Sequence, residues 1–248
     1  MKENFLISLN LKNKENINFE EYPFSVSSIG NLNKIIFHPN ITYIVGENGS
    51  GKSTILEALA IHQGFNAEGG TKNFNFSTNK SHSILHRHLK IKRSTKMLKD
   101  GFFLRAESFF NFASNIDNLD SIPSNSPKII NSYGCKSLHE QSHGESFFSL
   151  MQNRFGDNGL YILDEPEAAL SPSRQITMLA LIHDLIQRGS QFIISTHSPI
   201  LLSYPNALIY EINNEGYINK VLYEETDIYL NTTDFLSNYK KFHKKLKL

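Results

Sequence analysis

The sequence predicts an α/β fold with a largely parallel central sheet. Short apolar stretches of strand length alternate along the chain with longer stretches whose apolar residues recur at helical spacing. A glycine-rich turn also joins one such strand directly to a helix. The chain has 248 residues, 40% of them hydrophobic, which is enough for a core that folds without disulfides, and we expect a single domain over residues 1–248.

The individual elements follow from their apolar patterns in chain order. Residues 5–11 alternate apolar and polar side chains, which predicts a strand, and residues 41–45 form a β-branched apolar run typical of a buried strand. The other expected strands are residues 101–104, 160–163 and 191–195. The expected helices are residues 53–62, 108–116, 145–154 and 172–188, and an amphipathic C-terminal helix containing Leu236, Tyr239, Phe242 and Leu246.

The composition excludes several classes of protein. The formal net charge is +1, so the chain is not a uniformly basic nucleic-acid binder. The single cysteine, Cys135, excludes an intrachain disulfide and a cysteine-cluster metal site. The chain lacks an apolar run of about 18 residues and a signal-peptide pattern, so we expect a cytoplasmic location and no membrane span.

A glycine-punctuated loop connects the strand at 41–45 to the helix at 53–62. Glycines in such a loop let backbone N–H groups converge on phosphate oxygens, and the helix adds the positive end of its dipole. We expect Lys52 to reach the β- and γ-phosphates of ATP and Ser53 to ligate Mg²⁺. The loop fits the pattern G-x-x-x-x-G-K-[ST] in full and consists of Gly46, Glu47, Asn48, Gly49, Ser50, Gly51, Lys52, Ser53 and Thr54.

Two later strands end in polar residues that suit the same site. Ligands of open parallel sheets bind at the carboxyl ends of strands, so Asp164 is expected beside the phosphate loop, holding Mg²⁺ directly or through water. Glu165 is the candidate base that polarises the attacking water. His197, after the strand at 191–195, is placed to contact the γ-phosphate and orient that water.

The phosphate loop, the run ILDEPEAAL and the run ISTHSP together resemble the ABC-ATPase class. The resemblance is to its soluble branch, which includes structural-maintenance-of-chromosomes proteins, DNA-repair ATPases and overcoming-lysogenization-defect ATPases. The closest group in character is the short, stand-alone "AAA family" ATPases of bacteria and phages. The resemblance implies a P-loop NTPase fold with antiparallel N-terminal strands. It also implies a small helical subdomain, at about residues 101–158, within the ATPase domain.

The resemblance implies further site residues. The segment from Ser142 to Glu145 is similar to the signature motif S-G-G-[QE], with His143 in place of the first glycine, so Ser142, Gly144 and Glu145 are expected to contact the γ-phosphate bound to a second subunit. Residues 169–172 resemble the D-loop. The Q-loop position has no glutamine, and Glu107 is a candidate for its Mg²⁺ role, with Arg105 as an alternative phosphate contact. Tyr22 and Phe24 are both candidates for stacking on adenine.

The implied activity is hydrolysis of ATP by a homodimer that clamps two Mg-ATP between its subunits and drives a partner by opening and closing. Three roles stay open at this point. The first is DNA repair or phage defence, with DNA as a partner and a separate nuclease or effector subunit. The second is the nucleotide-binding subunit of a membrane transporter. The third is a nucleotide-gated scaffold with little turnover.

A basic run between the phosphate loop and the signature segment has two interpretations. Phosphate contacts to DNA or RNA are one, and a solvated face is the other and commoner one. The run consists of Arg87, Lys90, Lys92, Arg93, Lys96 and Lys99. The lysines near the C-terminus are expected on the solvated side of the final helix.

Overall fold

The computed structural model describes residues 4–71, 83–122, 127–133 and 143–247. Its centre is a six-stranded sheet in the order β5-β6-β7-β3-β8-β9, in which β9 alone runs antiparallel to its neighbour. These strands are β3 (Ile41–Gly46), β5 (Asp100–Arg105), β6 (Gly159–Asp164), β7 (Gln191–Ser195), β8 (Leu208–Ile212) and β9 (Ile218–Val221). The α/β class with a largely parallel sheet is therefore confirmed.

The central strands are apolar throughout because both faces of the sheet are covered. Successive side chains of a strand point to opposite faces, and in β6 Tyr161 and Leu163 enter one hydrophobic cluster whereas Leu160 and Ile162 enter the other. The strand expected at 41–45 divides in the same way between its two faces. The apolar runs of the sequence thus correspond to strands that are buried on two sides.

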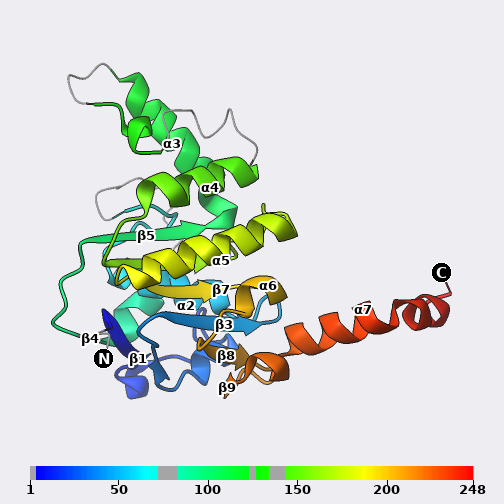
Figure 1. The fold of residues 1–248 in the computed structure, drawn as a ribbon. Coiled ribbons are helices and arrows are strands. Elements are labelled where there is room, and N and C mark those ends of the chain that lie inside the picture. The colour runs from blue at the N-terminus through cyan, green and yellow to red at the C-terminus, as the bar shows by residue number, and fades with distance from the viewer. Residues whose placement is uncertain (1–3, 72–82, 123–126, 134–142, 248) are drawn as a thin grey trace.

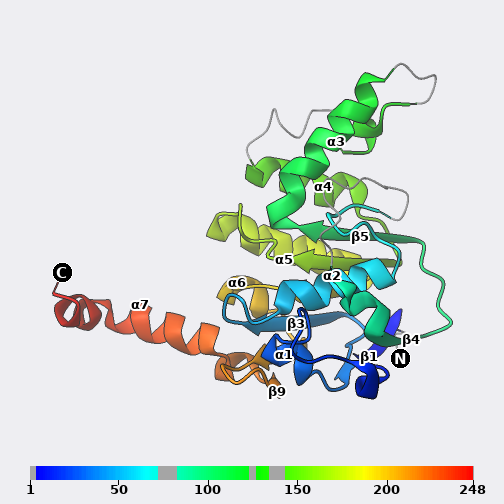
Figure 2. The same cartoon turned by 180° about the vertical axis from the view of Figure 1, so that it is seen from behind.

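Helices cover the two faces, as Figures 1 and 2 show from opposite sides. One face carries α2 (Lys52–His62) and the short helix η2 (Ile84–His88). In the ranges that the structure describes, the opposite face carries five other helices, whose apolar residues pack in the other hydrophobic cluster. Those helices are α3 (Phe109–Ser121), η4 (Ile129–Tyr133), α4 (His143–Arg154), α5 (Pro172–Gln187) and α6 (Pro199–Leu202).

A second, antiparallel sheet lies beside the first, as the resemblance implied. Its order is β2-β1-β4, with β1 (Leu6–Leu11) between β2 (Ile35–Ile36) and β4 (Leu89–Arg93). The buried side chain of Gln191 joins the two sheets, since its amide accepts from the N–H groups of Phe5 and Leu6 at 3.0 and 2.9 Å and donates to the carbonyl of Leu6 at 2.9 Å. Near this sheet lie η1 (Lys14–Asn16) and α1 (Ser27–Gly30).

The helical part lies beyond the β5 edge of the sheet (Figure 1). The boundary expected at residue 101 falls inside β5, and the chain then passes through η3 (Ala106–Ser108) into α3. Phe102 of β5 packs on Phe112 of α3, with ring centroids 5.4 Å apart, and also on Phe155, so the aromatic core is continuous across the edge.

The C-terminal helix α7 (Asp227–Lys245) follows η6 (Tyr223–Glu225) and projects away from the body (Figures 1 and 2). It carries the amphipathic pattern that the sequence predicts, but none of its residues is buried. No helix in the described part of the chain is long and apolar enough to span a membrane.

Candidate nucleotide-binding site

The loop between β3 and α2 is curled in a way that only glycine permits at two positions. Gly46 and Gly51 have φ of 146° and 97°, in the region that L side chains rarely adopt. A Cβ atom at Gly46 would lie 2.8 Å from the carbonyl oxygen of Ile212, and one at Gly51 would lie 2.5 Å from the hydroxyl oxygen of Ser28. Ser28, on α1, also donates its hydroxyl to the carbonyl of Ser50 and so braces the loop from outside.

Lys52 begins α2 and is almost fully buried, with 3% of its surface exposed. Its ammonium group donates to the carbonyls of Gly46 and Glu47 at 2.8 and 2.9 Å, which holds it across the inside of the loop. Burial lowers the pKa of Lys52, and the nearby carboxylates of Glu165 and Asp164 oppose that shift. A cation in this position complements a phosphate group bound by the loop.

Asp164 ends β6 beside the loop and receives two hydroxyl donors. Ser53 donates to its Oδ1 at 3.1 Å, and Ser195 donates to the same atom. Asp164 pairs in register with Ser195 of β7, so sheet topology brings them together. Burial raises the pKa of Asp164, while the hydrogen bonds from Ser195 and Ser53 and the charge of Arg105 counteract part of that rise. Sequence reasoning identified Ser53 and Asp164 but not Ser195.

The donor set fits a magnesium ion that also binds phosphate. Mg²⁺ favours oxygen ligands and usually takes only one or two from protein, with waters and phosphates completing its shell. Ser53 and Asp164 supply a hydroxyl and a carboxylate at one point. Within the described residues no cluster of three His, Cys, Asp or Glu side chains suits a metal. The buried hydroxyl oxygen of Ser50 has no hydrogen-bond partner there, which leaves it available to a ligand of the loop.

Arg105, at the end of β5, connects the acidic groups around this point. Its guanidinium contacts Glu57 at 2.8 Å and Glu107 at 3.1 Å, and its Nε lies 3.8 Å from Oδ2 of Asp164. Glu107 is the expected third magnesium ligand, but its side chain is 80% exposed and it pairs with Arg105 rather than with the Ser53–Asp164 pair. Glu57, on α2, escaped sequence reasoning because a glutamate inside a helix carries no motif.

Glu165 and His197 lie next to each other, just after the carboxyl ends of β6 and β7. Oε1 of Glu165 lies 3.5 Å from Nε2 of His197, and both side chains are partly exposed. Glu165 has φ of 52°, a left-handed conformation that is uncommon outside glycine, and its N–H donates to the carbonyl of Ser195 at 3.1 Å. The His197 N–H donates to Glu167 at 2.5 Å, and burial raises the pKa of Glu167. Glu167 was not predicted, although it stands in the same DEPE segment.

The signature segment lies only partly within the described residues. Ser142 lies outside them, whereas Gly144 and Glu145 are in the first turn of α4. Helix α4 packs on the sheet face opposite α2, and Glu145 contacts Arg174 of α5 at 3.4 Å. Glu145 thus lies beside α5 on that face of the sheet.

The two aromatic candidates for stacking on adenine differ in exposure. Tyr22 is 63% exposed, whereas Phe24 is 4% exposed and packs edge-on against His88. The side chain of Tyr22 is accessible to a ligand, and that of Phe24 belongs to the core.

Two family models match this chain, one on each side of residues 101–105. The AAA domain model matches residues 13–100, and the AAA ATPase domain model matches residues 106–202. The first match contains the phosphate loop, and the second contains Asp164, Glu165 and His197. The fold is of the P-loop NTPase class. The two matches together support, more narrowly, an ABC-ATPase-like protein.

Comparison with solved structures finds similar chains at low sequence identity. An SMC head domain from Thermotoga maritima is 18% identical, with 88% of this chain and 99% of that chain covered and a TM-score of 0.45. A putative metal-chelate type ABC transporter in an inward-facing conformation is 16% identical, with 94% and 88% covered and a TM-score of 0.49. An SMC head bound to the C-terminal winged-helix domain of ScpA is 16% identical, with 88% and 97% covered and a TM-score of 0.49. No curated protein matches the chain.

Proposed function

We propose that the protein binds Mg-ATP and hydrolyses it to ADP and phosphate, with Lys52, Ser53 and Asp164 as the nucleotide and metal contacts. The observation that supports this most directly is the convergence of a buried lysine, a serine–aspartate pair and a Glu165–His197 pair at the carboxyl ends of β3, β6 and β7. Backbone N–H groups of residues 46–54 and the N-terminus of α2 complete an anion site there.

The proposed chemistry assigns each side chain one role. A Mg²⁺ ion held by Ser53 and Asp164 would withdraw charge from the phosphates. Lys52 neutralises the β- and γ-phosphate oxygens, and Asp164 and Ser53 hold the metal side of the site. Glu165 accepts a proton from the attacking water as that water bonds to the γ-phosphorus and the bond to the bridging oxygen of ADP breaks. His197, whose Nε2 lies 3.5 Å from Oε1 of Glu165, donates to a γ-phosphate oxygen next to that water.

The proposed assembly is a homodimer with two shared sites. Ser142, Gly144 and Glu145 of one subunit contact the γ-phosphate held by the other subunit. The position of Glu145 supports this, because it lies in the first turn of α4 with its side chain 53% exposed. The N-terminus of α4 is the end of the helix that favours an anion. ATP thus links the subunits, and hydrolysis releases them.

The test is the Glu165→Gln variant, which keeps the shape of the site and removes the base. With saturating Mg-ATP it is expected to accumulate as a dimer, measured by light scattering during gel filtration, while phosphate release falls by at least about 100-fold. Glu224→Gln, at an exposed position outside the site, is the matched control and is expected to behave as wild type. A Glu165→Gln variant that remains monomeric under these conditions contradicts the shared site.

We further propose that the cycle acts in the cytoplasm on a partner in DNA repair or phage defence. The resemblance of the motifs to the soluble branch of the class supports this role. Hydrolysis stimulated by added DNA is the expected result. Co-purification with a membrane subunit would instead identify a transporter, and retained dimerisation with negligible turnover would identify a scaffold.

A further inference from the structure

The outward face of the antiparallel sheet collects polar and basic side chains. Ser8 and Asn10 of β1 pair in register with Lys92 and Lys90 of β4. Opposite residues of an antiparallel pair share a face, so all four lie on one side of the sheet. Residues of the alternate positions, such as Leu9 and Leu89, enter the hydrophobic core instead. Strand alternation thus explains why Lys90 and Lys92 of β4 are exposed.

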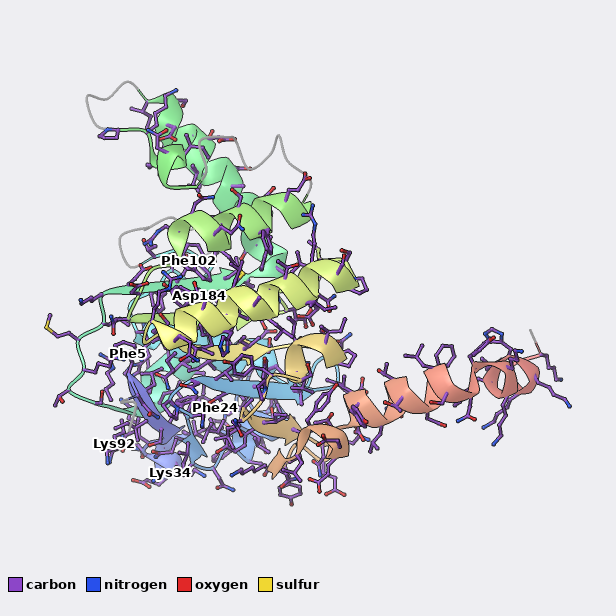
Figure 3. All side chains as sticks on the ribbon, in the orientation of Figure 1. Phe5, Phe24, Lys34, Lys92, Phe102 and Asp184 are labelled. Carbon is purple, nitrogen blue, oxygen red and sulfur yellow. The ribbon has the colours of Figure 1, made fainter. Side chains whose placement is uncertain are left out.

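Two further lysines join this face from other segments and form a pocket with it. Lys14 of η1 and Lys34, which precedes β2, line a hollow of about 630 Å³ together with Lys90 and Lys92. Figure 3 labels Lys34 and Lys92, which lie at the same corner of the molecule near β1. Among the described residues that line this lysine pocket, none is acidic.

The ammonium groups of these four lysines have no bonding partner among the described residues. Within the described part of the chain none of them makes an ion pair or a hydrogen bond, whereas Arg105 at the end of β5 and Arg154 at the end of α4 are paired with carboxylates. Two other basic residues of the same run have partners. Arg93 donates to the carbonyl of His62 at 3.0 Å, and Lys96 donates to the carbonyl of Gly189 at 2.8 Å. Arg93 and Lys96 are therefore bonded within the fold, whereas Lys90 and Lys92 face the pocket without a partner among the described residues.

We propose that the lysine pocket is a second anion site, which binds closely spaced phosphate groups. Like charges gathered in one hollow repel each other, and bound phosphates relieve that repulsion while releasing condensed counterions. The formal net charge of the whole protein is only +1, so the positive charge here is local rather than general. A nucleic-acid backbone and a free polyphosphate both carry this chemistry. The site uses none of the phosphate-loop residues and does not depend on hydrolysis of ATP.

The test uses the Lys52→Ala protein, so that the phosphate loop does not contribute. Binding of a short fluorescent DNA duplex is measured by anisotropy over a range of salt concentrations, and binding of inorganic tripolyphosphate by calorimetry. Replacing Lys14, Lys34, Lys90 and Lys92 by Gln is expected to weaken binding of at least one probe by about tenfold or more. For the duplex, the slope of log affinity against log salt is expected to fall by about 0.9 for each phosphate that the variant no longer neutralises.

The matched control replaces Lys240, Lys241, Lys244 and Lys245 on α7 by Gln, which removes the same charge from a different surface. This control is expected to keep binding within about twofold of the parent. Weaker binding of the duplex alone identifies nucleic acid as the source of phosphate, and weaker binding of tripolyphosphate as well identifies the phosphate chain itself. No binding of either probe, or an equal effect in both lysine variants, overturns the proposal. Retention of Mg-ATP by the pocket variant with Lys52 restored shows that it is folded.

Discussion

The carboxyl ends of β3, β5 and β6, here called the phosphate-loop edge, and the lysine pocket are two cationic regions that differ in how their charged groups are bonded. At the edge, Lys52 is buried and donates to two carbonyls, and Arg105 is shared among carboxylates. In the pocket, Lys34 and Lys92 are exposed and make no ion pair within the described residues. The edge therefore keeps its geometry by internal bonds, whereas the pocket keeps its charge available.

The difference has a physical reason. A buried charge needs partners because removal from water is costly, and those partners then hold it in one orientation. An exposed lysine keeps its hydration and its rotamer freedom, so it can meet anions of varied shape but fixes none of them. The edge is suited to one ligand in one pose, and the pocket to a repeating charge.

The largest expected effect is on ATP binding, which should depend on the phosphate-loop edge and not on the lysine pocket. Lys52→Ala removes the cation from the inside of the phosphate loop and is expected to weaken ATP binding by at least about 100-fold, because the phosphates then lack a charge-assisted hydrogen bond in a buried site. Lys92→Ala, the matched control in the pocket, is expected to leave ATP binding unchanged. Calorimetric titration with Mg-ATP measures both. Equal ATP affinity in Lys52→Ala and wild type would remove the basis for the edge as a nucleotide site.

An intermediate effect is expected on the free energy of unfolding, which should depend on the charged groups of the phosphate-loop edge more than on those of the pocket. Arg105→Gln leaves the carboxylate of Glu57, which is 12% exposed, without its ionic partner, and is expected to cost about 2 kcal/mol of unfolding free energy. Replacing the four pocket lysines by Gln changes the formal net charge from +1 to −3 (+1 − 4) but is expected to alter stability by less than about 0.5 kcal/mol. Urea unfolding followed by circular dichroism gives both values. If the lysine variant loses more stability than Arg105→Gln, those lysines have structural partners.

The smallest expected effect is on the pH dependence of stability. It involves Asp100, another carboxylate that is paired within the fold. Burial alone would raise the pKa of Asp100, but the Arg154 guanidinium at 2.9 Å and hydrogen bonds from Tyr161 and Gly156 outweigh it and hold the pKa below its usual range. Stability from this group is present above the unfolded pKa of about 3.9 and is lost as pH falls through the lower folded value.

Asp100→Asn is accordingly expected to cost about 1 kcal/mol at neutral pH and to flatten the loss of stability in acid. The measurement is unfolding free energy as a function of pH for wild type and variant. A variant whose stability falls with acid as steeply as that of wild type would show that the pairing of Asp100 does not stabilise the fold.

Much of the fold and part of the candidate site could be predicted because their signals are local. The strands at 41–45 and 160–163 are continuous apolar runs, and a run of that kind marks a strand covered on both faces. The curl of residues 46–54 depends on glycines within the loop itself. The edge strand β9, the two-residue β2 and the support from Ser28 carry no such pattern and were not predicted.

The sequence by itself determined the chemistry at the strand ends, since Lys52 and Ser53 are joined to their loop by covalent spacing and Asp164 and Glu165 to their strand. Only the tertiary structure decided which partners those groups have. Ser195 reaches Asp164 because β7 lies next to β6, and Lys14 and Lys90 share a pocket although 76 residues separate them in sequence (90 − 14). It also decided that α7, whose amphipathic pattern is visible in the sequence, buries none of its residues against the described chain. Spacing along the chain limits local geometry, but contacts between distant segments depend on how the strands are ordered, and no residue type encodes that order alone.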